Sequence, residues 1–312
     1  MRASSFRRIA PVAVLAALLS AIGAGNPSFL SFDNLGVLAD ESSVILLLAT
    51  GQTLVILLGG IDLSTASLAG LASVLMALTL PSLGGAGVIG VLALTTVVGA
   101  FQGAVHVQAQ MPSVVVTLAG QGMWSGLAMG IAHATIPVNA GYDAVGWLGE
   151  SSLRVPHSFA FALAVLAVLS ACLHWLPFGR YLRAIGLNPR AALLCGIRVG
   201  RVKVLAFALS GLFSGLAGMQ MVARTDSGNP TIADSLLLPS IVAVAIGGTA
   251  MMGGIGGLGR TLTGALIVTV LRVGIAATGF DPAYEPFVYG TLAVIGAALT
   301  VDRSQRSPTS QS

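Results

Sequence analysis

The chain has 312 residues, of which 55% are hydrophobic and only 8% are charged, and 40 are glycine. In soluble domains roughly a quarter of all residues are charged, so this composition excludes a water-exposed globular fold. It indicates an all-α polytopic membrane protein. The net charge of +4 does not indicate a nucleic-acid partner, because the basic residues gather at the chain ends and in one internal segment, as positive-inside topology predicts.

Apolar runs bounded by Gly, Pro or charge predict about ten membrane-spanning helices in a single transmembrane domain, 1–312. Residues 63–142 alone contain no Asp, Glu, Lys or Arg, which is room for three crossings at about 20 residues each. With the amino terminus inside, ten crossings bring both termini to the cytoplasm and end in a short polar cytoplasmic tail, 303–312. The predicted spans are residues 9–25, 43–59, 65–80, 87–107, 113–133, 157–176, 204–223, 236–252, 261–277 and 284–300.

The first run follows three arginines and resembles a secretory signal, although its length favours an uncleaved first helix.

A polar interruption separates the second predicted span from the third. Paired glycines followed by Asp62 and Ser64 predict an unwound break, at which one helix stops and the next starts, capped by either of these side chains. Intramembrane carboxylates usually line cavities, so Asp62 either faces a polar pathway or is only a helix cap near the membrane boundary. Upstream polar residues either line the same pathway or bond to a neighbouring helix. The candidate pathway residues are Gln52, Thr53, Gly59, Gly60, Asp62 and Ser64.

Glycines three or four residues apart predict that helix backbones approach closely in lipid. One set is Gly211, Gly215 and Gly218, and the other joins Gly120 or Gly122 with Gly126 and Gly130. Residues 112–126 also resemble residues 239–253 in the order of Pro, Ser and Gly. With the predicted topology these copies run in opposite directions, as in the inverted repeats of transporters, although chance explains the echo equally well in glycine-rich apolar sequence.

A basic segment, residues 178–203, lies between two apolar runs and contains no acid, so it is expected as a cytoplasmic loop. Asn188 and Pro189 predict a helix of its own, with Asn188 as the N-cap and proline at the first helical position, ending before Gly196. A short helix presented to the cytosol is a place for a partner to hold. The basic residues are Arg180, Arg183, Arg190, Arg198, Arg201 and Lys203.

Residues 254–259 match a GxGxxG pattern, and Asp281 follows at a suggestive distance. A membrane helix is expected on each side, so the strand that gives a dinucleotide fingerprint its meaning is missing. The pattern is better interpreted as a membrane re-entry or a tight turn. Arg272, within the ninth span, either reaches the outer surface or contacts a polar substrate, and we favour the former.

Several chemistries are missing from the sequence. Lys203 is the sole lysine and follows Val202, so there is no GK[ST] phosphate loop and no nucleotide hydrolysis by this chain is expected. There is no row of buried carboxylates and histidines of the kind that proton-coupled carriers use. Cys172 and Cys195 offer neither a disulfide framework nor a metal spacing. A transporter without its own energy source must take it from a partner.

Five stretches carry a resemblance to a known family and together cover most of the chain in the family's order. They are GQTLVILLGGIDLSTASLAGL (51–71), PSVVVTLAG (112–120), FGRYLRAIGLNPRAALLCGIRVGRVK (178–203), ALSGLFSGLAG (208–218) and AIGGTAMMGGIGGLGRTLTGALI (245–267). The chain resembles the permease subunits of ABC importers for ribose, xylose, related monosaccharides and autoinducer-2.

The resemblance implies a ten-helix permease of the bacterial inner membrane that is not itself an enzyme and holds no cofactor or metal. It implies as partners a second permease copy or a paralogue, membrane lipid, a cytoplasmic ABC ATPase that binds ATP and Mg, and a periplasmic sugar-binding protein. By position it assigns ATPase coupling to Gly186, Asn188, Pro189, Arg190, Ala191, Ala192 and Gly196.

Three alternatives stay open at this stage. A branched-chain amino-acid ABC permease shares the helical plan, and a secondary carrier working alone would need no ATPase. A membrane-embedded enzyme is the third, although we find no paired carboxylates, catalytic Cys and His arrangement or metal ligands for it.

Overall fold

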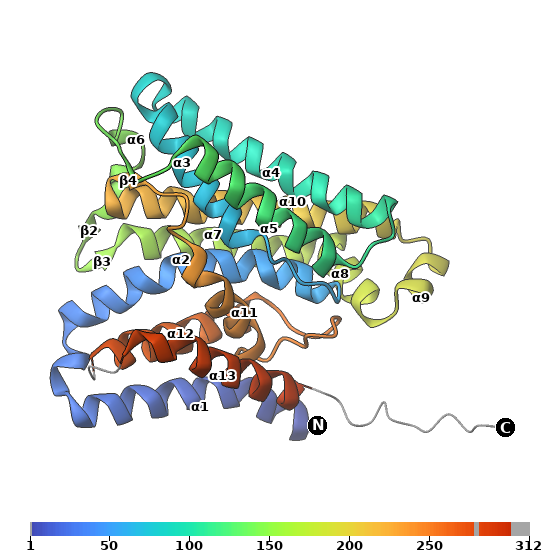
Figure 1. Cartoon of the computed structure of the whole chain (residues 1–312). Coiled ribbons are helices and arrows are strands. Elements are labelled where there is room, and N and C mark those ends of the chain that lie inside the picture. The colour runs from blue at the N-terminus through green and yellow to red at the C-terminus, as the bar shows by residue number, and fades with distance from the viewer. Residues whose placement is uncertain (1, 278–280, 301–312) are drawn as a thin grey trace.

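The computed structural model describes residues 2–277 and 281–300, and the predicted tail, 303–312, lies outside them. The chain is built almost entirely of helices, most of which run alongside one another in a bundle (Figure 1). This confirms the all-α class. The long apolar helices are α1 (Arg2–Gly25), α2 (Phe32–Leu57), α3 (Thr65–Leu83), α4 (Gly85–Gln108), α5 (Ser113–Ile131), α7 (His157–Trp175), α10 (Val199–Thr225), α12 (Leu258–Ala277) and α13 (Glu285–Thr300).

Shorter elements connect them. Two-residue strands form two antiparallel pairs, in which β1 (Ile136–Pro137) pairs with β4 (Ser227–Gly228) and β2 (Ser151–Ser152) with β3 (Val155–Pro156). The other short elements are η1 (Pro27–Leu30), α6 (Asp143–Gly146), η2 (Trp147–Gly149), α8 (Pro177–Leu187), α9 (Pro189–Leu194), η3 (Asp234–Leu236), α11 (Leu237–Ile246) and η4 (Pro282–Tyr284).

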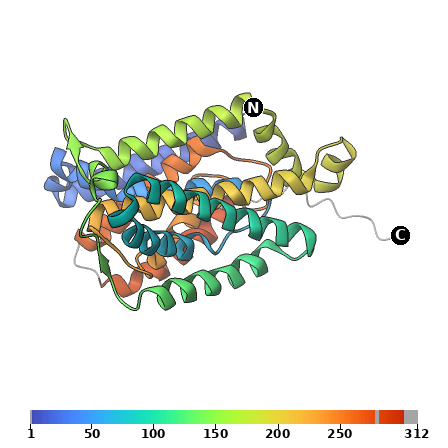
Figure 2. The ribbon, with the colours of Figure 1, turned by 90° about the horizontal axis from the view of Figure 1, so that it is seen from above.

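The bundle has two distinct ends. The start of α1, the end of α13 and helix α9 lie at one end, and α9 projects beyond its neighbours in both views (Figures 1 and 2). We call this the α9 end. The opposite end carries α6 and the short strands (Figure 1). Successive long helices run from one end to the other and back, as the spans of a polytopic membrane protein do.

Among the described residues, seven helices are long and apolar enough to cross a membrane: α2, α3, α4, α5, α7, α10 and α12. The apolar part of α1 and the η3–α11 stretch are shorter, and α13 has 16 residues. The predicted count of ten spans therefore stays a prediction. The predicted bounds of the third to seventh and ninth spans agree with α3, α4, α5, α7, α10 and α12 to within a few residues.

Helix α2 corrects the second predicted span, because it begins at Phe32 rather than at residue 43. Ser31 caps it by accepting a hydrogen bond from the Asn34 N–H. The prediction failed because Asp40 and Glu41 interrupt the apolar run. Inside the bundle both carboxylates are paired with arginine, so the helix passes through them, and from residue 42 to residue 57 every position is buried.

The eighth predicted span, 236–252, is not one continuous helix. Helix α11 ends at Ile246 after ten residues, and residues 247–257, which we call the glycine segment, are irregular. Gly248, Gly253 and Gly254 adopt φ values of 90°, 91° and 77°, which a right-handed helix cannot contain. The segment joins two helices, which confirms that the GxGxxG pattern lies in an irregular turn rather than after a strand.

The segment 178–203 is mostly helical rather than a loop. Helix α8 occupies its first part and buries Gly179, Leu182 and Ile185 on one face, and α10 already begins at Val199. The sequence analysis predicted a loop because the basic side chains of this segment interrupt the apolar pattern of the buried face. The sequence echo between 112–126 and 239–253 does not mark equivalent structures either, since Pro112 precedes α5 whereas Pro239 lies inside α11.

Close backbone contact joins α10 to its neighbours, as the first glycine set predicts. A Cβ at Gly211 would stand 3.1 Å from the Cα of Gly99 in α4, and one at Gly218 would stand 2.9 Å from the Cβ of Ala72 in α3. At Gly122, Gly126 and Gly130 no neighbouring atom lies within 4 Å of that position, so the second set makes no such contact within this chain.

Replacing Gly99 by Leu is expected to destabilise the bundle, because the side chain would have to enter the backbone of α10. Overpacking of this kind costs typically 1–3 kcal/mol, roughly several degrees in the thermal midpoint. Thermal unfolding of the detergent-purified protein measures it. Gly90→Leu is the matched control on the same helix, since nothing lies within 4 Å there. Equal midpoints for the two variants would contradict the packing.

Candidate functional site

The candidate site is the break between α2 and α3, residues 58–64. Helix α2 ends at Leu57, and Gly59 turns the chain with a φ of 81°. A residue with a Cβ is strained in this left-handed conformation, which explains the glycine. The chain then runs without helical hydrogen bonds to Thr65, where α3 begins. The predicted unwound break is confirmed, but the predicted cap is wrong, because Ser64 at the N-cap position of α3 makes no side-chain capping bond and Asp62 accepts from Ser64 instead.

Asp62 lies in the middle of this break and is only 2% exposed. Its Oδ1 accepts hydrogen bonds from the Ser64 N–H at 3.0 Å and the Ser64 hydroxyl at 2.6 Å. Its Oδ2 accepts one from the Ser210 hydroxyl of α10 at 2.7 Å. A carboxylate in lipid is stable only when the protein supplies such donors. Asp62 therefore fixes the break against α10.

Two glutamines extend this polar network. The Gln52 amide of α2 donates to the Asp62 carbonyl and, at 3.2 Å, to the Thr65 hydroxyl. The Gln102 amide of α4 donates to the Ser64 hydroxyl at 3.1 Å. The network thus joins α2, α3, α4 and α10 around one short stretch of backbone.

Helix α5 provides hydrogen-bond acceptors for backbone N–H groups of the break that have no helical partner. The Ser113 hydroxyl accepts from the Ile61 N–H at 3.1 Å, and the Thr117 hydroxyl accepts from the Leu63 N–H at 3.0 Å. These residues sit one turn apart on α5 and present two oxygens to alternate residues of the extended chain. Side chains of α2 and α5 therefore hold backbone groups of the break that no helix satisfies.

Two buried polar atoms next to this network have no partner within the described residues: Gln102 Oε1 and Trp124 Nε1. A Cβ at Gly120 would stand against Gln102 Oε1 and 3.2 Å from Trp124 Nε1, so both atoms face the same point of α5. An acceptor and a donor without partners are unusual in a protein interior. They offer a hydrogen-bonding pair to a small polar molecule or to water.

The structure brings three of the predicted pathway residues together: Gln52, Asp62 and Ser64. Thr53 points elsewhere, because its hydroxyl lies 2.6 Å from the Thr261 hydroxyl of α12. The sequence analysis missed the partners from other helices, which are single polar residues in apolar runs and carry no local signal. They are Gln102, Ser113, Thr117, Trp124 and Ser210.

The predicted coupling helix is α9. The Asn188 side chain caps it by accepting from the Ala191 N–H at 3.0 Å, and Pro189 is its first residue, as predicted. Gly196 follows with a φ of 80°. Ala192 is buried, whereas Leu193 and Leu194 are 63% and 89% exposed. The residues assigned to coupling therefore form a capped helix that turns two leucines to solvent.

Backbone contacts connect the end of α8, the helix before α9, to the break. The Gly254 N–H of the glycine segment donates to the Leu57 carbonyl at 2.9 Å. A Cβ at Gly253 would stand 2.7 Å from the Gly59 nitrogen and 3.0 Å from the Cα of Gly186, at the end of α8. The end of α2, the end of α8 and the glycine segment therefore meet backbone to backbone at a glycine junction (Gly59, Gly186, Gly253 and Gly254), where the Leu187 side chain of α8 also packs on Gly254.

The opposite end is held by ion pairs. Arg224 Nε of α10 lies 2.9 Å from Asp40 Oδ2, and Arg272 Nη1 of α12 lies 3.7 Å from Glu41 Oε2, so two carboxylates of α2 fasten both helices. Arg272 thus pairs with α2 while 31% of its side chain stays exposed, and its reach to the outer surface stays a prediction. Burial raises the pKa of Tyr142 to about 12 at this end, so its hydroxyl stays protonated and donates to a carbonyl of α10.

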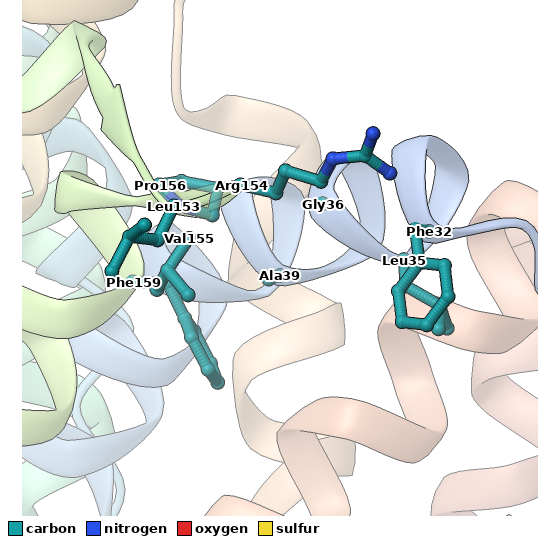
Figure 3. A pocket seen from close by; sticks show the side chains of 9 residues that line it. All are labelled: Phe32, Leu35, Gly36, Ala39, Leu153, Arg154, Val155, Pro156 and Phe159. Atoms are coloured by element: carbon teal, nitrogen blue, oxygen red, sulfur yellow. The ribbon is translucent and has the colours of Figure 1, made fainter.

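A cavity of about 550 Å³ lies beside these pairs, between the start of α2 and the β2–β3 hairpin (Figure 3). Its wall is largely apolar, with Phe32, Leu35 and Phe159 among its residues, and Arg154 is the only charged one among the described residues that line it. It shares no residue with the Asp62 network. We therefore do not assign it to the polar pathway.

Within the described part of the chain, no three His, Cys, Asp or Glu side chains gather closely enough to hold a metal ion. The expectation that this chain carries no cofactor or metal stays a prediction.

A bundle of apolar helices around a broken helix with a polar lining, and a short helix projecting from one end, is the architecture of multi-pass membrane permeases. Residues 35–297 match the family model described as the permease component of the branched-chain amino acid transport system. The chain belongs to this family.

Curated relatives share the whole length of the chain. It is 33% identical to the ribose import permease protein of Escherichia coli strain K12 over 301 residues, which is 94% of this chain and 92% of the relative. It is 35% identical to the ribose import permease protein of Bacillus subtilis strain 168 over 312 residues, 96% and 94% of the two chains. It is 32% identical to the fructose import permease protein of Rhizobium meliloti over 306 residues, 93% and 84%. No solved structure matches it significantly.

Replacing Asp62 by Ala is expected to destabilise the protein strongly. Each buried donor left without an acceptor costs about 1–3 kcal/mol, and the change orphans the Ser64 and Ser210 hydroxyls together. Asp62→Asn keeps the shape and one acceptor oxygen and should lose less. Thermal unfolding in detergent measures the order, with Asp33→Ala, an exposed carboxylate, as the control. An Asp62→Ala midpoint equal to that of the control would contradict the network.

Proposed function

We propose that this chain is the membrane permease of an ATP-driven importer that moves a monosaccharide or a similar small polar solute. The observation that carries the proposal is the continuous path from an exposed capped helix, α9, through the glycine junction to the polar break at Asp62. The relatives named as ribose and fructose import permeases support the choice of solute.

The α9 end faces the cytoplasm in this proposal. The segment around α8 and α9 carries six basic residues and no acid, and short basic segments stay on the cytoplasmic side. The start of α1 and the end of α13 lie at the same end, in keeping with two cytoplasmic termini and an even number of crossings in the inner membrane (Figure 1).

Helix α9 is the docking element for an ABC ATPase that binds ATP and Mg. Leu193 and Leu194 expose apolar surface at an aqueous end, and a partner groove would remove it from water. Movement of α9 pulls on α8, whose last turn holds Gly186 against Gly253 and the end of α2. A backbone contact of this kind passes displacement to the break without a flexible side chain between. Alternating access then follows from closure of the ATPase pair.

A second permease copy, or a paralogue, packs on α5. Gly122, Gly126 and Gly130 form a small-residue stripe on a helix whose outer face is exposed, and such stripes let a second helix approach closely in lipid. Trp124 of the same helix and Gln102 of α4 carry unpartnered polar atoms next to Gly120. This arrangement supports a solute pathway at the boundary between the two copies, fed by a periplasmic binding protein.

A neutral polyol suits this lining better than an amino acid. A zwitterion needs charged partners, whereas the buried carboxylate here, Asp62, already accepts three hydrogen bonds from its own chain. Amide, hydroxyl and indole groups match the hydroxyls of a sugar. The branched-chain amino-acid permease is kept as the second candidate because the family description names that system.

Uptake into proteoliposomes that contain this chain, its ATPase and its binding protein is the test of the function. We expect ATP-dependent accumulation of labelled ribose or fructose, and none with the ATPase omitted. Leucine should neither compete nor accumulate. Sugar uptake without any ATPase would favour a stand-alone carrier, and uptake of leucine in place of both sugars would favour the amino-acid permease.

Replacing Leu194 by Glu is expected to weaken association with the ATPase by tenfold or more, because a charge would have to enter the apolar contact. Co-purification and stimulated ATP hydrolysis measure it. Leu153→Glu is the matched control, an even more exposed leucine at the opposite end. Unchanged association of Leu194→Glu, or equal losses for both variants, would remove α9 from the docking role.

A further inference from the structure

A second cavity, of about 410 Å³, lies at the α9 end between α1, α7, α8 and the start of α12. It is separate from the break, from the glycine junction and from the exposed leucines of α9. Its wall includes Arg183, Arg260 and His174, and no Asp or Glu is among the described residues that line it. A concave surface that carries Arg183 beside a helix amino terminus suits a negatively charged group.

The positions of the two guanidinium groups are defined by the surrounding backbone. Arg260 Nη1 donates to the Gly248 carbonyl at 2.7 Å, which anchors this side chain on the glycine segment. Arg183 Nη2 lies 3.9 Å from the place where a Cβ of Gly257 would stand, so it reaches from α8 across to the first turn of α12. Guanidinium groups present several N–H donors in a plane and suit the oxygens of a phosphate.

The same wall contains the amino terminus of α12, a helix of 20 residues. Its first i to i−4 hydrogen bond runs from the Thr261 N–H to the Gly257 carbonyl, so the N–H groups of Leu258 and Gly259 precede the helical ladder. Both residues line the cavity. Such N–H groups and the helix dipole favour an anion, and they add to the arginines rather than replace them.

Exposed apolar residues near the cavity indicate at what depth in the membrane the cavity opens. His174 of the wall precedes Trp175, the last residue of α7, which is 78% exposed, and exposed tryptophans at helix ends mark the headgroup level of a membrane. Val12 of α1, also in the wall, is 52% exposed, and Val168 on α7 is 65% exposed. An occupant thus finds cations at the headgroup level and apolar helix faces below.

We propose that this cavity binds a phosphate group, and that an anionic phospholipid of the adjacent leaflet supplies it, with the headgroup phosphate between Arg183 and the first turn of α12. Basic pockets between helices bind anionic headgroups in this way. The orientation proposed above makes this the cytoplasmic leaflet, but the binding itself does not depend on that orientation.

The test is native mass spectrometry of the delipidated full chain in detergent, titrated with phosphatidylglycerol or with phosphatidylcholine of the same acyl chains. One phosphatidylglycerol should bind at least fivefold more tightly than phosphatidylcholine. Arg183→Gln should weaken phosphatidylglycerol binding by roughly fivefold, the effect of one basic residue near an anionic surface. Arg180→Gln removes an exposed arginine from the same helix, outside the cavity, and should bind as the native chain does.

Two further arms separate the sources and guard against misfolding. Inorganic phosphate should compete for the site, and if it binds with the same Arg183 dependence while the lipid does not, free phosphate and not lipid is the occupant, which overturns the lipid assignment. Gly257→Val keeps both arginines and fills the space beside Arg183, so it should also block binding. Equal affinity for the two lipids, or native affinity in both Arg183→Gln and Gly257→Val, would overturn the proposal.

Discussion

The whole arrangement depends on one requirement: backbone and carboxylate groups that lie inside an apolar bundle must find their partners within the protein. The break between α2 and α3 meets it with side chains from other helices. Asp62 accepts from Ser64 and from Ser210 of α10, while Ser113 and Thr117 of α5 serve the amides of the extended chain. Because each of these bonds fixes a helix in rotation and depth, the break sets the register of α2, α3, α5 and α10 around it.

The same residues show what could be read from the sequence. The break was predicted from its paired glycines and Asp62, and the short helix α9 from Asn188 and Pro189. Both could be predicted because a helix stop or a cap depends on residues that are close in the sequence. The partners of Asp62 could not be predicted, since Ser210 and Gln102 are single polar residues in apolar runs, whose orientation depends on distant helices.

Two helix boundaries were predicted wrongly, and for related reasons. The start of α2 was hidden because Asp40 and Glu41 end the apolar run, and only their pairing with Arg224 makes a helix through them favourable. The early end of α11 was hidden because its glycines lie in an apolar stretch whose composition still suits a span. Whether such glycines pack between helices or take positive φ depends on what approaches them, and here Gly253 meets the ends of two other helices.

Different interactions hold the helices together at the two ends of the molecule. At the α9 end, Gly186 of α8 meets the backbone of Leu57 and of the glycine segment directly, so at that residue no side chain lies between α8 and α2. At the other end, α2 is fastened to α10 and α12 by Arg224 and Arg272, whose side chains are 26% and 31% exposed. Partly hydrated ion pairs contribute little and separate by side-chain rotation alone. Helix α2 is therefore held by direct backbone contact at its end and by partly hydrated ion pairs near its start, with the buried stretch 42–57 packed between them.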